Sequence, residues 1–329
     1  MNYSKILGNF KKKNILVIGD LILDRYIWGR VSRISPEAPV PIVEVTAEDF
    51  LLGGASNVAH NIVSLGCGAT VVGFAGNDRG GDILRKMLDE KKIRHDGVVW
   101  TSRPTTMKTR VIAHSQQVVR FDREDNNRAD GRILAQLIGY VKNSLPNNDA
   151  VIISDYKKGV VSSNLVREIL RYAKQKNVFV AVDPKVGHFH FYKNASLITP
   201  NVQEASVASG IDIKDEKSLI QAGRSLLKKL SCAAVLITRG EHGVSLFRKD
   251  SVIHIPTIAK NVYDVTGAGD TVIAVFTLAY VSGAAMEEAA VIANHAAGVV
   301  VGEVGTAVIT AEQLRGSLAL NRIKISTAG

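Results

Sequence analysis

Residues 264–271 read Asp-Val-Thr-Gly-Ala-Gly-Asp-Thr and lead directly into a long apolar run. The three small residues at 267–269 let the backbone turn sharply, so that successive N–H groups point at one spot. A helix that begins there adds the partial positive charge of its N-terminus, which makes an anion-binding hole. Asp270, inside that hole, is well placed to take a proton from an attacking hydroxyl. An ordinary helix cap after a glycine turn explains the same residues, and local chemistry alone leaves both interpretations open.

Upstream of this stretch, short β-branched runs alternate with longer amphipathic runs, which is typical of a parallel sheet with helices on both faces. The apolar character of the short runs suits strands that are buried on both sides. The predicted strands are residues 15–18, 70–75, 150–154, 179–183, 197–199 and 234–238. The predicted helices are residues 57–65, 82–91, 128–145, 163–176, 216–230, 269–282 and 286–301. The pattern therefore predicts an α/β fold with a mostly parallel central sheet.

Two segments interrupt the alternation, about residues 26–45 and 98–122. The first carries Pro36, Pro39 and Pro41 among β-prone residues, and the second has no helical period. Because proline confines strands to edges and ends, we expect a small separate β-sheet, a lid that closes on substrate or pairs with a second subunit. An irregular hairpin that decorates the fold is the alternative. No sharp boundary divides the chain, so residues 1–329 are predicted to form one domain.

Composition narrows the class of protein. Of 329 residues 46% are hydrophobic and 22% charged, which is ordinary globular usage and excludes wholesale disorder. Two cysteines, Cys67 and Cys232, exclude a disulfide scaffold and suit a reducing compartment. No apolar run reaches the roughly 20 residues of a membrane-spanning helix, so we expect a cytoplasmic protein that binds no membrane.

The net charge of +10 permits attraction to anions such as phosphorylated metabolites. The only tight basic run is residues 11–13, and no basic helix or alternation of aromatic and basic residues occurs. We therefore predict no binding to nucleic acid. His188 and His190 lack a third ligand at a zinc spacing, which argues against a zinc site.

Several motifs are absent or weak. There is no G-x-x-x-x-G-K-[ST] loop, no G-x-G-x-x-G after the first strand and no G-x-S-x-G elbow. Asn201 and Glu204 share one helix face and provide hard oxygen ligands for hydrated Mg²⁺, although a helix cap with Glu at its third position explains them equally. The glycines at 53–54 and at 240 and 243 suit either a polar ligand or a tight turn.

Taken in order, these pieces resemble the ribokinase/PfkB family of carbohydrate kinases. The matching set is residues 19–24, Gly53-Gly54-x-x-Asn57, Asn201-x-x-Glu204, Thr238-x-Gly240-x-x-Gly243, residues 264–270, Asn294 and Gly305-Thr306. The resemblance spans about residues 14–310. The motifs taken together and in this order are far more specific to the family than any one of them alone. It implies a ribokinase-like three-layer sandwich and an enzyme that uses ATP and Mg²⁺.

The resemblance also implies a role for each matching residue. Asp270 is the catalytic base, and the amides of Gly267, Ala268 and Gly269 form the anion hole. The substrate side comprises Asp24, Asp20, Gly53, Gly54 and Asn57 for sugar hydroxyls, and Asp155. For a substrate phosphate at the far end of the pocket, the expected cations are Arg110 and Lys185, with Lys108, Lys157 and Arg33 behind them. A turn or cap role for Asp20 is equally open. The nucleotide side comprises Asn201, Val202, Gln203, Glu204, Thr238, Arg239, Gly240, Gly243 and Asn294. Glu204 is expected to hold Mg²⁺ through water, and Asp264 and Thr266 match the position of a monovalent cation such as K⁺.

Within that family the sequence is similar to the D-glycero-β-D-manno-heptose-7-phosphate kinases of lipopolysaccharide core synthesis. The similarity rests on residues 28–41, 108–110, 154–159 and 183–185. It implies phosphorylation of heptose 7-phosphate at the anomeric O1, which gives the 1,7-bisphosphate on the route to ADP-heptose. Many such proteins carry a C-terminal nucleotidyltransferase domain with an H-x-G-H motif. These 329 residues contain no such motif, so we expect either the kinase-only form or the kinase domain of the bifunctional enzyme.

Other functions remain open at this point. A kinase for another sugar or sugar phosphate, such as ribose or fructose 6-phosphate, has the same motifs, because a few lid and pocket contacts decide the sugar. A non-catalytic regulator that binds a sugar phosphate is the other candidate, although a pure binder has no need of a base. The apolar residues of the lid (Ile27, Trp28, Val31, Val43 and Val45) predict a homodimer through the lid sheet.

Overall fold

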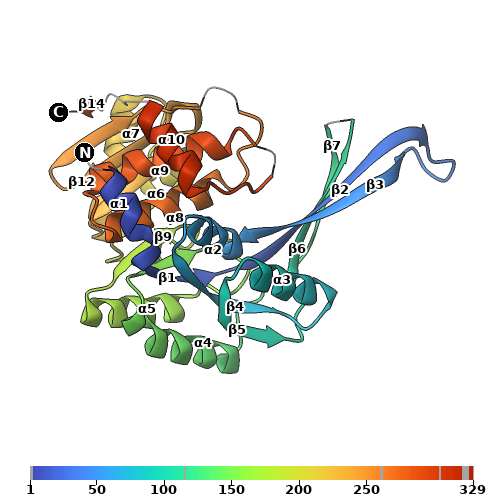
Figure 1. Cartoon of the computed structure of the whole chain (residues 1–329), viewed down its shortest axis with the longest axis horizontal. Coiled ribbons are helices and arrows are strands. Elements are labelled where there is room, and N and C mark those ends of the chain that lie inside the picture. The colour runs from blue at the N-terminus through green and yellow to red at the C-terminus, as the bar shows by residue number, and fades with distance from the viewer. Residues whose placement is uncertain (1–2, 115, 260–261, 304, 321–325, 329) are drawn as a thin grey trace.

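The central layer of the computed structural model is a mostly parallel sheet (Figure 1). The structure describes residues 3–114, 116–259, 262–303, 305–320 and 326–328. The strands of this sheet are β1 (Asn14–Gly19), β4 (Gly68–Gly76), β5 (Arg94–Thr101), β8 (Ala150–Ser154), β9 (Phe179–Asp183), β10 (Leu197–Ile198), β11 (Ala234–Thr238), β12 (Val244–Arg248), β13 (Ser251–Ile255) and β14 (Ser326–Ala328). Their order is β14-β13-β12-β11-β10-β9-β8-β1-β4-β5. Neighbours from β5 to β11 are parallel, and the pairs from β11 to β14 are antiparallel.

Helices cover both faces of this sheet. They are α1 (Tyr3–Asn9), α2 (Ala55–Ser64), α3 (Arg79–Glu90), α4 (Gly131–Ser144), α5 (Ser163–Lys176), α6 (Val202–Ser209), α7 (Glu216–Leu230), α8 (Ala268–Val281), α9 (Met286–Val300) and α10 (Ala311–Leu320), with short 3₁₀ turns at Phe10–Lys12, Leu145–Asn147, Phe189–Tyr192 and Gly240–His242. Strand β1 shows why two cores form. Ile15 and Val17 enter the core under α2, α8 and α9, whereas Leu16 and Ile18 enter the core under α4, α5 and α7. The predicted three-layer α/β sandwich is confirmed.

A second, smaller sheet projects from this body (Figure 1). Its strands are β2 (Leu21–Ile34), β3 (Pro41–Gly54), β6 (Thr106–Ala113) and β7 (Gln116–Arg123), in the order β3-β2-β6-β7. The predicted bounds of this lid are partly wrong, because its first strand begins at residue 21 and residues 98–101 belong to β5 in the central sheet. Only Asp20 separates β1 from β2, so one length of chain supplies a strand to each sheet.

The proline positions explain the shape of the lid. Pro36 and Pro39 lie in the turn between β2 and β3, and Pro41 is the first residue of β3. Proline lacks an N–H, so a turn and a strand start are the places that tolerate it. The long hairpin β2–β3 therefore pairs from residue 41 onward, with register shifts between Trp28 and Gly29 and between Val31 and Arg33.

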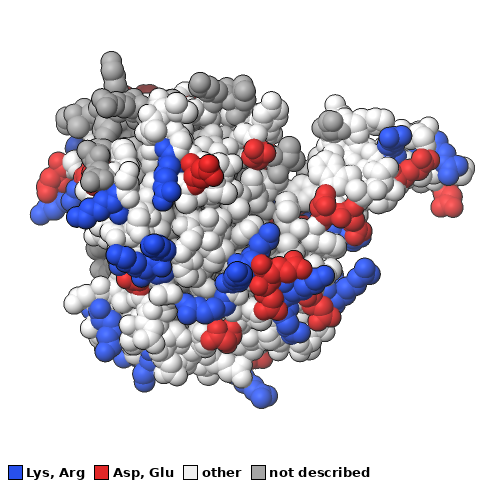
Figure 2. Space-filling model, in the orientation of Figure 1, with Lys and Arg blue, Asp and Glu red and all other residues white. Residues whose placement is uncertain are grey.

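The predicted strands and helices of the central body are all present, with bounds that differ by at most three residues. The prediction missed α1, α6 and α10, which are short or lie near the chain ends. Among the described helices, none combines the length and the apolar character that crossing a membrane needs. On the face in Figure 2, basic and acidic side chains are interspersed, so the net charge of +10 is not gathered there into one stripe.

Candidate active site

The predicted site residues gather where the parallel strands end. Asp20 follows β1, Asp155 follows β8, and Thr238 ends β11. Asp183, for which the sequence predicted no role, ends β9. In an open α/β sheet the carboxyl ends of parallel strands meet at one edge, and the loops beyond them bind ligands. Helix α8 reaches the same edge, because its Asp270 is hydrogen-bonded to Tyr156 just beyond β8.

Asp270 is the centre of this site. Its side chain is buried, with an exposed fraction of 2% for the residue. Asn57 Nδ2 donates to Asp270 Oδ2 at 2.8 Å, and the Tyr156 hydroxyl donates to Oδ1 at 2.9 Å. Burial raises the pKa of Asp270 to about 6, while the hydrogen bonds from Asn57 and Tyr156 oppose that rise. A carboxylate of this kind is ionised at neutral pH and basic enough to accept a proton.

The anion hole predicted at residues 267–269 is a real helix start. Gly267 caps α8 with a φ of 81°, in the left-handed region. A Cβ at this position would lie 2.8 Å from Asn57 Nδ2, so the residue must be glycine to spare the Asn57–Asp270 hydrogen bond. In the first turn of α8 the Ala268 N–H donates to the Val265 carbonyl at 3.2 Å. The N–H groups of Gly269 and Asp270 have no such backbone partner in the described residues, and they remain available to an anion.

Helix α2 fixes α8 in place. The Thr271 hydroxyl donates to Asn61 Oδ1 at 2.9 Å, and Asn61 Nδ2 donates to the carbonyl of Asn57 at 3.0 Å. Both asparagines are buried. Buried amide groups with satisfied hydrogen bonds define a unique geometry, so this network holds the base relative to the rest of the site.

Asp24 lies where the lid meets the body. It is 4% exposed, and Arg110 Nη1 donates to its Oδ1 at 2.6 Å. A Cβ on Gly53 would lie 2.2 Å from Asp24 Oδ2, which explains a glycine there. Asp24 is paired across β2 and β6 with Lys108. The structure thus brings Asp24, Gly53, Lys108 and Arg110 together.

The cations near Asp24 differ in their partners. Arg110 pairs with Asp24, Arg120 with Asp122, and Lys158 with Glu124. For the Lys108 ammonium, no carboxylate lies within ion-pair distance in the described parts of the chain. Its nitrogen lies 5.0 Å from the centre of the Tyr156 ring. Burial and the neighbouring cations lower the pKa of Lys108, so the ammonium is held there at a cost.

Two carboxylates predicted on the substrate side, Asp20 and Asp155, accept hydrogen bonds from groups of the protein. Asp20 accepts from the backbone N–H groups of Tyr156, Lys158 and Val160, at 2.8, 3.0 and 3.0 Å. This geometry supports the turn role that the sequence left open for Asp20. Asp155 accepts from His188 Nδ1 at 2.7 Å and from the Tyr192 hydroxyl. Asp155 is 2% exposed and faces this internal network.

The nucleotide-side residues form a second group. Asn201 and Glu204 cap α6 reciprocally, with Glu204 N donating to Asn201 Oδ1 at 2.9 Å and Asn201 N donating to Glu204 Oε2 at 3.1 Å. The other oxygen of Glu204 accepts from Lys185 at 3.3 Å, which places Lys185 beside the predicted metal residue. Asn201 also forms a β-bridge with Thr238, and Val202 and Gln203 lie in the first turn of α6.

Asp183 and Glu204 are close enough to affect each other. Burial, Asp270 and Glu204 raise the pKa of Asp183 well above its ordinary value. Neighbouring carboxylates with hard oxygen donors are the ligand set that Mg²⁺ takes in proteins, and a divalent cation relieves their repulsion. Among the described residues, however, no group of three or more His, Cys, Asp or Glu side chains could hold a metal ion, so these carboxylates would need water to complete the coordination.

The remaining predicted residues have protein partners of their own. Asn294 Nδ2 donates to the Pro256 carbonyl at 2.8 Å, and Arg239 Nη2 donates to the His242 carbonyl at 2.6 Å. Asp264 accepts from the N–H groups of Thr266 and Gly305 at 2.9 and 3.0 Å. The turn Gly240–His242 and Gly243 close the loop after β11. Lys157 lies in the loop after β8, and Arg33 lies near the outer end of β2.

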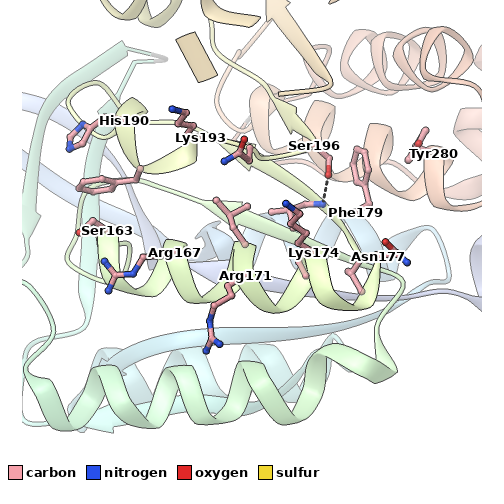
Figure 3. A pocket seen from close by; sticks show the side chains of 16 residues that line it. Ser163, Arg167, Arg171, Lys174, Asn177, Phe179, His190, Lys193, Ser196 and Tyr280 are labelled. Atoms are coloured by element: carbon pink, nitrogen blue, oxygen red, sulfur yellow. Dashed lines mark hydrogen bonds between the residues drawn. The ribbon is translucent and has the colours of Figure 1, made fainter. Parts of the chain in front are cut away.

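A cavity of about 1000 Å³ lies elsewhere (Figure 3). Its walls include Arg167, Arg171 and Lys174 of α5 and Lys193. Phe179, the first residue of β9, also lines it, so this cavity is at the amino ends of the strands. Since the ligand edge of an α/β sheet is the opposite one, we do not assign the cavity to the active site.

Sequence reasoning missed two residues of this site. Tyr156 donates to Asp270, and Asp183 lies near both Asp270 and Glu204. Each stands at or directly beyond the carboxyl end of a predicted strand. That position was the signal that could have found them, because the loops at this edge build the site.

Comparison with known proteins adds relatives to this geometry. Residues 12–313 match the family described as pfkB family carbohydrate kinase. The bifunctional protein HldE of Syntrophotalea carbinolica is 44% identical over 320 residues, which cover 97% of this chain and 65% of that protein. The bifunctional protein HldE of Helicobacter hepaticus is 46% identical over 305 residues, covering 92% of this chain and 63% of that protein. This chain thus spans less than two thirds of the length of these relatives.

Solved structures share the fold. Phosphofructokinase-2 from Escherichia coli in complex with potassium superposes with a TM-score of 0.79 and 19% identity, covering 93% of this chain and 98% of that chain. Arabidopsis thaliana ribokinase complexed with ribose and ATP gives 0.76 and 21%, covering 94% and 99%. The predicted ribokinase-like fold is confirmed.

Proposed function

The chain belongs to the pfkB family of carbohydrate kinases, and we propose that its sugar is D-glycero-β-D-manno-heptose 7-phosphate, phosphorylated by ATP at the anomeric O1. The product is the 1,7-bisphosphate. One observation carries the choice of a sugar that already bears a phosphate. The partly buried ammonium of Lys108 lies near Asp24, but Asp24 pairs with Arg110. No carboxylate of the described residues lies at ion-pair distance from Lys108, and a substrate phosphate supplies the missing anion.

Asp24 and Lys108 then divide the recognition of the sugar. The Asp24 carboxylate, held by Arg110, accepts hydrogen bonds from hydroxyls. The Lys108 ammonium binds the 7-phosphate. The lid carries both residues on neighbouring strands, so its position relative to the body sets the distance between phosphate and reacting hydroxyl.

In the reaction, Asp270 accepts the proton of the O1 hydroxyl. The O1 oxygen forms a bond to the γ-phosphorus of ATP, the bond from that phosphorus to the β–γ bridging oxygen breaks, and ADP leaves. The amides of Gly267, Ala268 and Gly269 stabilise the charge on the transferred group. Asp183 and Glu204 would hold Mg²⁺, Glu204 through water. Mg²⁺ supplies charge neutralisation for the phosphate oxygens when it is bound.

The identity of the sugar draws further support from sequence. Residues 28–41, 108–110, 154–159 and 183–185 resemble heptose-7-phosphate kinases, and the HldE relatives share more than 40% of residues over most of this chain. A place in ADP-heptose and lipopolysaccharide core synthesis in the cytoplasm follows from this substrate. We also retain, as proposals, a single kinase domain, K⁺ beside Asp264 and Thr266, and a homodimer through the lid.

The test measures ADP release with Mg-ATP and a panel of D-glycero-β-D-manno-heptose 7-phosphate, ribose and fructose 6-phosphate. We expect a strong preference for the heptose phosphate, and turnover that Asp270→Asn abolishes while ATP binding persists. Faster turnover of ribose or fructose 6-phosphate would replace the proposed substrate. Binding of a sugar phosphate without turnover of any sugar would favour a regulator.

A further inference from the structure

Tyr156 contacts the proposed base, although no motif assigned it a role. It follows β8 in the loop that Asp20 holds, and its own backbone N–H donates to Asp20 Oδ2 at 2.8 Å. Its hydroxyl donates to Asp270 Oδ1 at 2.9 Å. The ammonium of Lys108 lies over its ring at 5.0 Å. Contacts from two different segments therefore fix this side chain, and a third segment fixes its backbone.

We propose that Tyr156 is a positioning residue, whose hydroxyl orients the Asp270 carboxylate and favours its ionised form. This inference rests on the proposed role of Asp270 as the base. Tyr156 itself takes no proton from the sugar.

The Asp270 carboxylate accepts one hydrogen bond on each oxygen, both from neutral donors. Asn57 binds Oδ2 and Tyr156 binds Oδ1, so the plane of the carboxylate is set from both sides. Each carboxylate oxygen has two lone pairs, and one remains on each oxygen for the substrate hydroxyl. A base whose orientation is fixed before the substrate binds does not have to reorient during the reaction, so no free energy of reorganisation adds to the barrier.

Tyr156 remains a donor at every pH of interest. Burial and the neighbouring carboxylates, Asp270 foremost, raise the pKa of Tyr156 well above its ordinary value, so the phenol stays protonated. A hydrogen bond donated to a carboxylate stabilises the charged form and lowers the pKa of that carboxylate. Removing the hydroxyl takes this contribution away.

The surrounding charges leave Asp270 sensitive to that loss. Burial and Asp24 on β2 raise its pKa, whereas Asn57 on α2, Tyr156 and the Lys108 ammonium on β6 lower it. Asp183 at the end of β9 is a further carboxylate near Asp270. With a pKa of about 6, Asp270 is mostly ionised at pH 7, and a moderate upward shift would leave much of it protonated.

The test is the pH profile of kcat/KM for Tyr156→Phe. Activity should fall as the pH drops through the pKa of Asp270, and in the variant this fall should begin about 1 pH unit higher, the size expected for one charge-assisted hydrogen bond. The variant should then be several-fold slower at pH 6 and should regain most activity above pH 8, with little change in KM for ATP. Thermal unfolding and ATP binding check that the variant is folded.

Tyr140→Phe is the matched control. Its hydroxyl also donates to a carboxylate, Asp96, but on α4 and β5 away from the site. We expect no shift of the acid limb in this variant.

The outcomes separate the inference from the proposed function. An equal loss of activity at all pH values, or an unmoved acid limb, would overturn the role of Tyr156 while Asp270→Asn stays inactive. Full turnover by Asp270→Asn would instead refute Asp270 as the base, and with it both statements.

Discussion

The substitution Lys108→Met tests whether Lys108 serves substrate binding or the stability of the fold. Methionine keeps the length and apolar stem of lysine and removes only the ammonium. In the described residues that ammonium has the Tyr156 ring as its neighbour and no carboxylate at ion-pair distance. The substitution therefore leaves no buried acidic group without its partner.

The substitution is expected to lower the catalytic efficiency and to raise the stability of the fold. A substrate phosphate at a partly buried ammonium contributes about 2–4 kcal/mol, so kcat/KM for the heptose phosphate should fall about 30- to 700-fold. Folding lowers the pKa of Lys108, mainly by burial. Such a lysine is charged at a cost at every pH below its folded pKa, and the cost is lost as the pH rises through that value. At pH 7 the variant should accordingly unfold at a higher temperature than the wild type.

The assay pairs ADP release with thermal unfolding, using heptose 7-phosphate and a sugar that lacks a phosphate. Because the Lys108 ammonium also lowers the pKa of Asp270, both sugars are compared at pH 8 or above, where Asp270 stays ionised without it. Turnover of the unphosphorylated sugar, if it is measurable, should there be nearly unchanged. Lys142→Met serves as the control, since Lys142 also lies over an aromatic ring, that of Tyr172 at 5.8 Å, but on α4. Unchanged kcat/KM for the heptose phosphate in Lys108→Met would refute the assignment of the phosphate to this side chain.

Three further predictions address the base, the metal and the lid. Gly267→Ala should destabilise the fold by about 1–2 kcal/mol, because residue 267 has a positive φ, and should lower kcat, because the added Cβ displaces Asn57 from Asp270. Denaturant unfolding and steady-state kinetics measure these two effects, and an unchanged stability and kcat would contradict the prediction. Glu204→Gln should raise the Mg²⁺ concentration for half-maximal rate about tenfold or more, whereas Glu168→Gln on α5 should not; equal Mg²⁺ dependence in both would remove Glu204 from the metal site. Sedimentation should give twice the 35.5 kDa mass of the chain, and Phe121→Asp, at a residue 52% exposed on the lid, should give the single mass; a wild-type monomer at micromolar concentration would exclude the dimer.

Local sequence pattern determined the elements of this fold. Strands such as β8, β9 and β11 were predicted with their observed bounds, because alternating or continuous apolar runs express burial over a few neighbouring residues. The stretch at 264–271 likewise predicted a helix start with a carboxylate in its first turn, and α8 begins there. Turn chemistry and helix polarity are local properties, so sequence is sufficient for them.

The lid was predicted only in part, because local sequence pattern does not show which strands pair. β-Prone residues at 98–101 are equally suited to either sheet, and their place in β5 depends on pairing with β4. Strand pairing joins segments that are distant in the chain, and a pattern within one segment carries no information about its partner.

The roles of polar side chains needed the tertiary structure most. Asn57 and Tyr156 meet Asp270 across 213 and 114 residues of chain, and the sequence gives no distance for either contact. Asp20 resembles a sugar ligand in the sequence, yet three backbone amides already occupy its carboxylate. Lys108 stands apart from Arg110, Arg120 and Lys158 only because the fold pairs each of these three with an acid. Which hydrogen bonds and ion pairs form depends on how distant segments cross, and that is decided by packing rather than by neighbours in the chain.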